Sequence, residues 1–348
     1  MKKTWQRIVD WELWPFYLIY TPLVFVWGYY VIKAKHFWFF APVNPTLDFS
    51  GFEGETKKEM FEQLDKKVYP TTIYIQPQTN FDKVLEQMTA ANLKFPVAVK
   101  PDIGTKGFCF RKIEDQVQLQ QYHQTLPLEY VLQEMIEWPL ELSIFYVRYP
   151  NEKKGQVTGF IAKEYLQVAG NGRSTLLELI DANPRASLRK NELIKKHKNK
   201  LGNIIPQHEN FFLSITGNHN RGAKFINLHN EIDEALVNVF DNISNNNNKF
   251  YYGRYDVKTT SIEDLKQGKN ISILEFNGVG AEPNHIYDCN MSYANALMVI
   301  AKHWGHMYRI GKYNHALGLP YIGFFEGWRH LRKAKAFYQR LKQYDLVC

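Results

Sequence analysis

The sequence predicts an α+β protein, and three observations support this prediction. Short strand-like runs alternate with helical segments along the 348 residues, and several neighbouring runs are separated only by turns, as in hairpins. The composition, 45% hydrophobic and 22% charged, is that of a globular protein. The chain is long enough for about two or three packed units.

The bulk charge favours anionic partners. The net charge of +8 suits nucleotides, anionic lipid head groups or nucleic acid. No zinc-finger spacing or RNA-binding signature accompanies it, so no nucleic-acid partner is expected. The three cysteines are scattered and odd in number, which favours a reducing compartment.

The amino-terminal region, residues 1–45, is expected to be membrane-associated. The stretch "LWPFYLIYTPLVFVWGYYVI", residues 13–32, carries no charge. As a helix it would be about 30 Å long, close to one hydrocarbon core. Its tryptophans and tyrosines suit the membrane interface, whereas Pro15 and Pro22 would kink the helix. The segment either spans the membrane or dips into one leaflet, and a buried aromatic helix of the core is the alternative.

The next elements follow from hydrophobic periodicity. A short region, 46–80, holds a helical candidate at 55–66 and a strand at 71–75. Residues 81–93 have helical spacing, with Phe81, Leu85 and Met88 on one side. Further strands are expected at 96–100, 107–113, 130–136, 140–149 and 156–163.

The second half of the chain shows the same mixture. A helix is expected from Ser174 as N-cap, a solvated loop at 195–200, strands in "KFYYGRYDVK" and "ISILEFNG", and helix from about residue 291. The last region, 311–348, ends in a basic amphipathic helix with a stripe formed by Trp328, Leu331, Tyr338 and Leu341. That stripe would face either an anionic membrane surface or the body of the protein.

A candidate phosphate site lies in "KFPVAVKPDIGTKGFCFRKI", residues 94–113. Lys100 ends an apolar strand, and the loop Gly104–Thr105–Lys106–Gly107 follows. Glycines let backbone amides approach an anion, and the lysines add charge. The loop matches neither the Walker A pattern nor the dinucleotide fingerprint. A glycine hairpin without a ligand is the alternative.

A candidate magnesium site lies near the other end of the chain. Period-two alternation places Arg254 and Asp256 on one face of a strand, and Glu275 and Asn277 share a face in the same way. Carboxylate and amide oxygens are the ligands that Mg²⁺ prefers. An arginine beside them could stabilise a transferring phosphate. Ion pairs of the carboxylates with Arg254 and Lys258 are the alternative.

Five stretches in order, "FPVAVKPDIGTKGF", "LQEMIEWPLE", "GRSTLLELI", "GRYDVK" and "LEFNG", resemble the ATP-grasp superfamily. Within it the chain is similar to the D-alanine–D-alanine ligases and the cyanophycin-synthetase-like carboxylate–amine ligases, over roughly residues 81–310. The resemblance implies an ATP-grasp fold in which a small lobe, 81–136, and a large lobe, 137–310, grip ATP.

The resemblance also implies roles for particular residues. Lys100 would contact the α- and β-phosphates, and Gly104, Thr105, Lys106 and Gly107 would close over the triphosphate. The adenine hinge would be formed by Gln133, Glu134, Met135 and Ile136, with Glu141 on the ribose. Further anion contacts would come from Lys163 and from Arg221 in "TGNHNRGAKFINL", where a structural turn is the alternative.

At the metal end, Asp256, Glu275 and Asn277 would hold two magnesium ions, with Glu275 bridging them. Arg254 would polarise the acyl phosphate. The chain departs from the D-alanine ligases where Thr105 and Lys106 replace two serines and where "NGVGAEPNHIYD" replaces "N-T-x-P-G-M-T". D-alanine is therefore not implied as the substrate. Glu282 and His285, which follow the metal strand, either face the acceptor or are satisfied loop residues.

The expected function is an ATP-dependent carboxylate–amine ligase that works through an acyl phosphate at the cytoplasmic face of the membrane. Its partners would be small-molecule or lipid-linked carboxylates and amines. Two alternatives remain: an ATP-grasp phosphotransferase or ligase with a non-amine acceptor, and a membrane-bound ATP-binding partner without turnover.

Overall fold

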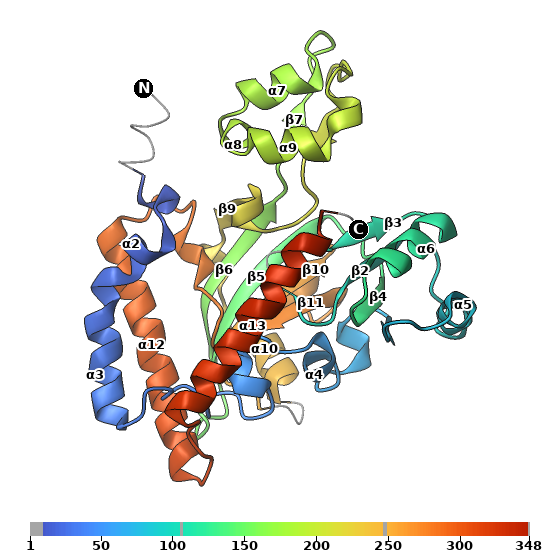
Figure 1. Cartoon of the computed structure of the whole chain (residues 1–348). Coiled ribbons are helices and arrows are strands. Elements are labelled where there is room, and N and C mark those ends of the chain that lie inside the picture. The colour runs from blue at the N-terminus through green and yellow to red at the C-terminus, as the bar shows by residue number, and fades with distance from the viewer. Residues whose placement is uncertain (1–9, 105–106, 246–248, 347–348) are drawn as a thin grey trace. The chain divides into compact units, whose positions relative to one another are not determined.

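A computed structural model describes residues 10–104, 107–245 and 249–346 (Figure 1). The chain divides into two compact units, the first formed by Met1–Ile161 with Leu228–Cys348 and the second by Ala162–Asn227. Helices and antiparallel strands are mixed along the chain, so the predicted α+β class is confirmed.

The first unit contains a four-stranded sheet in the order β1-β4-β2-β3. The strands are β1 (Thr72–Ile75), β2 (Val97–Pro101), β3 (Arg111–Ile113) and β4 (Tyr130–Glu134), and every pairing is antiparallel. Helices α5 (Phe81–Ala90) and α6 (Gln116–Thr125) bury Val84, Met88 and Leu119 in the core of this sheet. The apolar spacing predicted for 81–93 is thus the buried face of α5.

A second sheet has the order β11-β10-β5-β6-β9. Its strands are β5 (Leu140–Val147), β6 (Gln156–Glu164), β9 (Lys224–Asn227), β10 (Tyr252–Thr259) and β11 (Ile271–Asn277). Strand β10 lies between β5 and β11 and is antiparallel to both. On β10, Tyr255 and Val257 are buried on one face, and the other face carries the partly exposed Arg254 and Lys258 with the buried Asp256 between them.

The remaining helices of the first unit surround these sheets. They are α2 (Phe16–Tyr20), α3 (Val24–Ala34), α4 (Lys57–Phe61), α10 (Glu234–Asn245), α11 (Ile262–Lys266), α12 (Tyr293–Ala316) and α13 (Phe324–Tyr344). Figure 1 shows α3 running alongside α12, and the two helices are in contact. A short 3₁₀ turn, Thr21–Leu23, separates α2 from α3 at Pro22, so the predicted proline kink is present.

The second unit is small and has its own core. It contains β7 (Gln167–Ala169), β8 (Asn210–Phe212), α7 (Leu176–Ala182), α8 (Pro184–Ser187) and α9 (Lys190–Lys196). Its buried side chains include Leu176, Ile180, Leu193 and Leu213. Helix α7 is capped by Thr175, one residue after the predicted Ser174, in a capping box with Glu178.

Three local predictions differ from the structure. The strand predicted at 107–113 begins only at Arg111, because Gly107 and Cys109 adopt positive φ and form a turn first. The helix predicted at 55–66 is shorter and ends at Phe61. Residues 195–200 are not a loop, because α9 extends to Lys196 and a 3₁₀ turn follows over Lys198–Lys200.

The stripe predicted on the last helix packs on the body of the first unit. Leu341 is fully buried in the core of the first sheet, and Leu331 packs against a second, aromatic core. The hydroxyl of Tyr338 accepts a hydrogen bond from the Gly54 backbone at 3.0 Å. Of the two alternatives for α13, the structure therefore favours packing on the body for most of the stripe.

A single buried asparagine connects the amino-terminal region to the second sheet. The Oδ1 atom of Asn44 accepts hydrogen bonds from the backbone N–H groups of Tyr251 and Tyr252 at 2.9 and 3.1 Å. Its Nδ2 atom donates to the carbonyls of Tyr252 and Ser50 at 2.8 and 3.2 Å. Asn44 thus acts as an extra strand segment at the start of β10.

Replacing this side chain should destabilise the first unit. Asn44→Ala leaves buried backbone groups of Tyr251 and Tyr252 without partners, which should lower the free energy of unfolding by about 3 kcal/mol. Urea unfolding followed by circular dichroism measures this change. Asn151→Ala, at an exposed turn position, is the control and should change the value by less than about 0.5 kcal/mol. Equal effects of the two substitutions would contradict the assigned role of Asn44.

Candidate active site

Four of the predicted site residues lie together on one face of β10 and β11. Asp256 is the direct cross-strand partner of Glu275, and Arg254 is the partner of Asn277. Directly paired residues of antiparallel strands have Cα atoms about 4.5–5.5 Å apart and point to the same face. The sheet therefore brings two carboxylates, an amide and a guanidinium into one patch.

A β-bulge interrupts β11 at this point and provides a contact for Lys100. Asp256 pairs with Glu275, but the next residue, Val257, pairs with Ile273, so Leu274 is left without a ladder partner. The Leu274 carbonyl accepts a hydrogen bond from Lys100 Nζ at 3.0 Å. The Lys100 ammonium, at the end of β2, is therefore held next to β11, the strand of the other sheet that carries Glu275.

Burial and a second lysine make the ammonium of Lys100 unusually weakly basic. Removal from water, together with the nearby Lys57 ammonium, lowers the pKa of Lys100 to about 7, and the Glu275 and Glu141 carboxylates oppose this effect only in part. Lys57 is buried, and its Nζ atom donates to the Asp102 carbonyl at 3.1 Å. Two cationic side chains thus lie close together in a region where water is largely excluded.

Lys57 also lies at the start of the glycine loop. A Cβ atom placed on Gly104 would lie 3.2 Å from Lys57 Nζ. Gly107 follows in the turn at positive φ, and the predicted Thr105 and Lys106 lie outside the described residues. Lys57 was missed by the sequence analysis, although Thr56 marks the N-cap of its helix. No motif distinguishes it from the exposed Lys58 beside it.

The glycines after β11 bring the segment before α4 to the site. The Ser50 and Gly51 carbonyls accept from the backbone N–H groups of Val279 and Gly280 at 3.1 and 3.0 Å. A Cβ atom on Gly278 would lie 2.2 Å from the Ser50 oxygen, so only glycine permits this approach. The sequence "GVG" therefore serves backbone packing here.

The segment before α4 adds a further carboxylate, Glu55, to the site. Burial, together with the nearby Glu275 carboxylate, raises the pKa of Glu55 to about 7. Lys57 acts in the opposite direction. Glu55 could not be identified from the sequence, because it is 220 residues from Glu275 and only the tertiary fold brings the two carboxylates together.

Arg254 is held between Asp256 and the loop that follows β11. Its Nε atom lies 3.3 Å from Asp256 Oδ1, and its Nη1 atom donates to the Glu282 carbonyl at 3.1 Å. Ser143 also donates to Asp256, and Asn284 donates to Ser143 at 3.0 Å. The ion pair between Arg254 and Asp256, which the sequence offers as the alternative to a magnesium site, is therefore present.

The donor set fits magnesium. Asp256 and Glu275 offer carboxylate oxygens from adjacent positions, and Asn277 offers an amide. The Nδ2 atom of Asn277 is buried and has no hydrogen-bond partner among the residues that the structure describes. Mg²⁺ would bind the Oδ1 atom of this amide, whereas the Nδ2 atom is a donor and would suit a phosphate oxygen.

The residues predicted for the adenine hinge lie at the end of β4. Gln133 is buried and its amide donates to Thr72 Oγ1 at 2.7 Å, so its side chain is engaged in the first sheet. Glu134 is exposed and accepts from the Thr71 backbone at 3.4 Å. Met135 and Ile136 follow the strand and are half-buried. Their role as a hinge stays a prediction.

Glu141, predicted on the ribose, is the second residue of β5 and the cross-strand partner of Lys258 on β10. Its carboxylate raises the pKa of Lys100, so it belongs to the same electrostatic environment as Glu275. Lys258 donates to the Trp138 carbonyl at 3.2 Å.

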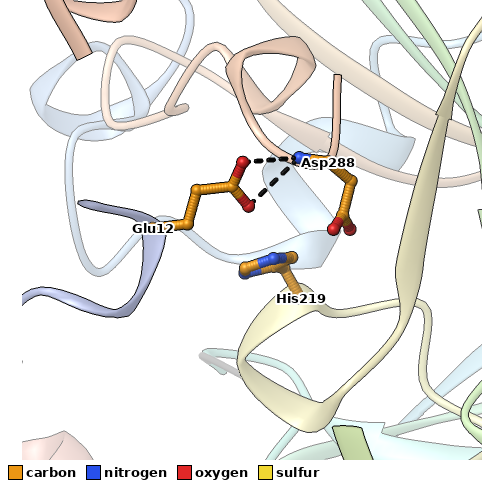
Figure 2. A group of neighbouring side chains, drawn as sticks. All are labelled: Glu12, His219 and Asp288. Atoms are coloured by element: carbon orange, nitrogen blue, oxygen red, sulfur yellow. Dashed lines mark hydrogen bonds between the residues drawn. The ribbon is translucent and has the colours of Figure 1, made fainter. Parts of the chain in front are cut away.

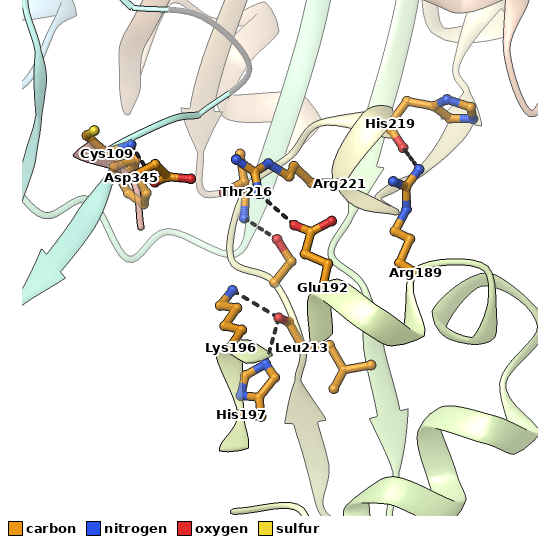
Figure 3. Close-up of polar contacts among 12 residues, drawn as sticks. Cys109, Arg189, Glu192, Lys196, His197, Leu213, Thr216, His219, Arg221 and Asp345 are labelled. Atoms are coloured by element: carbon orange, nitrogen blue, oxygen red, sulfur yellow. Dashed lines mark hydrogen bonds and ion pairs between the residues drawn. The ribbon is translucent and has the colours of Figure 1, made fainter. Parts of the chain in front are cut away.

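Two of the predicted anion contacts, Lys163 and Arg221, lie in the second unit. Lys163 lies on β6 and is half-buried. Arg221 forms an ion pair with Glu192, with Nη1 2.6 Å from Oε1 (Figure 3). In the same turn the His219 carbonyl accepts from Arg189 Nη2 at 3.1 Å. An anion would have to compete with Glu192, and the roles of Lys163 and Arg221 stay predictions.

Glu282 and His285 differ in their surroundings. Glu282 Oε1 accepts hydrogen bonds from the hydroxyls of Tyr20 and Tyr287 at 2.5 and 2.8 Å. His285 packs on Gly159, and its buried Nδ1 atom has no hydrogen-bond partner among the described residues. Burial lowers the pKa of His285 to about 4, so this imidazole is neutral.

No family model and no curated protein matches the chain. Among solved structures it is similar to D-alanine–D-alanine ligase from Bacillus anthracis, at 13% identity and a TM-score of 0.41, over 76% of this chain and 69% of that chain. It is also similar to a bifunctional glutathione synthetase from Pasteurella multocida, at 12% identity and a TM-score of 0.38, over 70% of this chain and only 35% of that chain. A third is the VanG D-Ala:D-Ser ligase from Enterococcus faecalis, at 14% identity and a TM-score of 0.38, over 69% and 57%.

The D-alanine–D-alanine ligase and the glutathione synthetase are both ATP-grasp enzymes. At 12–14% identity and TM-scores of 0.38–0.41 this likeness assigns no role to any residue and no reaction to the chain.

The buried ammonium of Lys100 should make stability depend on pH. Its pKa is about 7 in the folded protein and about 10.5 when unfolded, so the unfolded chain binds more protons between these values. The stability of the wild type therefore rises with pH across this window. Lys100→Met removes this contribution, so its stability relative to wild type should be higher at pH 6 than at pH 10, by on the order of 2 kcal/mol.

Urea unfolding of both proteins at pH 6 and pH 10 measures this difference. Lys83→Met, at an exposed position of α5, is the matched control and should keep the pH dependence of the wild type. A parallel pH dependence for Lys100→Met and wild type would show that Lys100 is not buried as described.

Proposed function

We propose that this protein is an ATP-dependent carboxylate–amine ligase of the ATP-grasp type, which forms an amide through an acyl phosphate. The observation that carries the proposal is the hydrogen bond from Lys100 to the Leu274 carbonyl, beside Glu275. It places a buried pair of lysines next to two paired carboxylates. Cations on one side and metal-binding oxygens on the other are what a triphosphate requires.

The two lysines supply the phosphate contacts in this proposal. ATP would bind with its phosphates against Lys57 and Lys100, near the glycine loop that begins at Gly104. A phosphate anion relieves the repulsion between the two ammonium groups, which raises the pKa of Lys100 again. The site is therefore prepared for an anion before one arrives.

The carboxylates hold the metal. Asp256, Glu275 and Asn277 would bind Mg²⁺, with two ions as the resemblance implies and Glu275 as the bridging ligand. When bound, the metal neutralises charge on the β- and γ-phosphates. The chain itself contributes positioning and charge, which agrees with the absence of a nucleophile–base pair among the residues assigned to the site.

The reaction has two steps. A substrate carboxylate oxygen attacks the γ-phosphorus, the bond to the bridging oxygen of ADP breaks, and an acyl phosphate forms. The nitrogen of a deprotonated amine then attacks the acyl carbon, the C–O bond to phosphate breaks, and the amide forms as the nitrogen releases its second proton. Arg254 would stabilise the oxyanion of the tetrahedral intermediate, because its guanidinium is already fixed beside Asp256.

The acceptor amine would bind near Glu282. The Glu282 carbonyl accepts a hydrogen bond from Arg254, so this residue adjoins the guanidinium that would stabilise the oxyanion. Tyr20 and Tyr287 fix the carboxylate in place. A fixed carboxylate can orient an ammonium group before it is deprotonated.

Glu275→Gln tests the metal end. Loss of the bridging carboxylate should lower ATP- and carboxylate-dependent ADP release at least about 100-fold. The assay supplies ATP, Mg²⁺ and a fractionated small-molecule extract as the source of carboxylates, and hydroxylamine traps the acyl phosphate as a hydroxamate. Glu263→Gln, at an exposed position of α11, is the matched control and should keep full activity. ATP binding by the wild type with no hydroxamate from any fraction would count against a ligase.

Glu282→Gln tests the acceptor end. The glutamine keeps an oxygen for the two phenols but removes the charge, so the KM for the amine should rise about tenfold or more. Hydroxamate formation should stay at the wild-type rate, because hydroxylamine is neutral at pH 7.5. If hydroxamate formation fell together with amide formation, Glu282 would belong to the first step and not to the acceptor side.

A further inference from the structure

The apolar amino-terminal segment, Phe16–Ala34, has one attached face and one outward face. It is long and apolar enough to cross a membrane by length and composition, and only 11% of it is buried. Trp27, Tyr30 and Val31 pack against the aromatic core of the first unit. On the opposite face of α3, Phe25, Tyr29 and Ile32 are exposed, and Phe16, Tyr17 and Val24 are exposed elsewhere in the segment.

The attached face fits closely onto α12. The rings of Trp27 and Trp304 have centroids 5.1 Å apart, and those of Tyr30 and Tyr308 are stacked at 5.0 Å. A Cβ atom on Gly305 would lie 2.8 Å from the Tyr30 hydroxyl, so the absence of a side chain there lets the two helices approach. Figure 1 shows the two helices side by side.

Polar contacts attach the same segment to the loop that carries Glu282. Tyr20 donates to Glu282, and the Tyr293 hydroxyl donates to the Ile19 carbonyl at 3.0 Å. Just before the segment, the Glu12 carboxylate accepts from the Asp288 backbone N–H at 3.1 and 3.2 Å (Figure 2). A segment that crossed a bilayer would have to give up the contacts of Tyr20 and Ile19 and uncover α12.

The broken backbone also disfavours crossing. The segment consists of α2, a 3₁₀ turn and α3, and Pro22 lies in the turn. Pro22 has no backbone N–H, so one hydrogen bond of a continuous helix is missing at this turn, which costs more inside hydrocarbon than at the interface.

The outward face matches a lipid surface better than a second copy of the chain. Lys33 and Lys35 end the segment, and the chain carries a net charge of +8, so two copies meeting at this face would repel each other. Exposed apolar side chains also occur at the start of α13, where Phe325 is exposed and the ring centroid of its neighbour Phe324 lies 5.3 Å from that of Phe37. Aromatic side chains flanked by lysines are typical of segments that lie in the membrane interface.

From these contacts we infer that Phe16–Ala34 lies along one leaflet of an anionic membrane, attached to the catalytic body, and does not cross it. Through Tyr20 this arrangement places Glu282 close to the lipid surface. Given the proposed ligase reaction, on which this one consequence rests, the acceptor or donor is then a lipid-borne substrate. The membrane contact itself does not depend on the reaction.

The first experiment measures vesicle binding. Full-length protein is floated with vesicles of 70% phosphatidylcholine and 30% phosphatidylglycerol, at low salt and without ATP. Phe25 and Ile32 are 84% and 77% exposed, so Phe25→Ser with Ile32→Ser should lower the partition coefficient at least about tenfold. Val117→Ser, which removes a 64% exposed apolar side chain from α6, is the matched control and should bind as wild type does. Absence of vesicle binding, or equal binding of all variants, overturns the inference.

The second experiment separates lying from crossing. A photocrosslinker, p-benzoylphenylalanine, replaces Tyr293, whose ring lies 5.2 Å from that of Trp14. Irradiation of the vesicle-bound fraction should give crosslinks to residues 11–20, as in solution. Vesicle-bound protein that loses these crosslinks has released the segment from the body, which overturns the inference. Dimerisation that is abolished by the Phe25 and Ile32 substitutions would also overturn it, because a second copy would then cover the face.

Neither experiment uses ATP. A protein that binds vesicles and keeps its crosslinks but forms no hydroxamate would refute the ligase proposal and leave the membrane inference standing. A protein that forms the hydroxamate but does not bind vesicles would refute only the membrane inference.

Discussion

The candidate site depends on one contact, the hydrogen bond between the Lys100 ammonium and the Leu274 carbonyl. Leu274 lies at the bulge in β11, outside the ladder with β10. Lys100 lies one residue before the end of β2, whose last residue is Pro101. Because β11 is also the edge strand of its sheet, carbonyl groups on its outer side can accept hydrogen bonds from the other sheet.

The electrostatic consequence of that contact is a balance between burial and charge. Water is excluded from two ammonium groups, which lowers the pKa of Lys100, and the same exclusion raises the pKa of Glu55. Lys100 and Glu55 are therefore both close to their titration points near neutral pH. Sites of this kind respond strongly to an incoming charge, which is why perturbed pKa values concentrate where ligands bind.

The amino-terminal region is part of the candidate site. Asn44 attaches the chain to β10, and the backbone around Ser50 packs on the glycines after β11. The segment that follows delivers Glu55 and Lys57, and the segment before it delivers Tyr20 to Glu282. The short region predicted at 46–80 thus contributes to the site itself.

The sequence by itself determined the elements with strong periodicity and the residues that share one strand. Alternation along β10 and β11 was enough to place Arg254 with Asp256 and Glu275 with Asn277, because side chains two apart on a strand always share a face. The strand ending at Lys100 could be predicted in the same way. Only the tertiary structure decided that Lys57, Glu55 and Tyr20 belong to the candidate site, because their positions depend on long-range packing at Asn44 and Gly278. It also decided that the carbonyl facing Lys100 is that of Leu274, because this contact depends on strand order and strand pairing, which local composition does not encode.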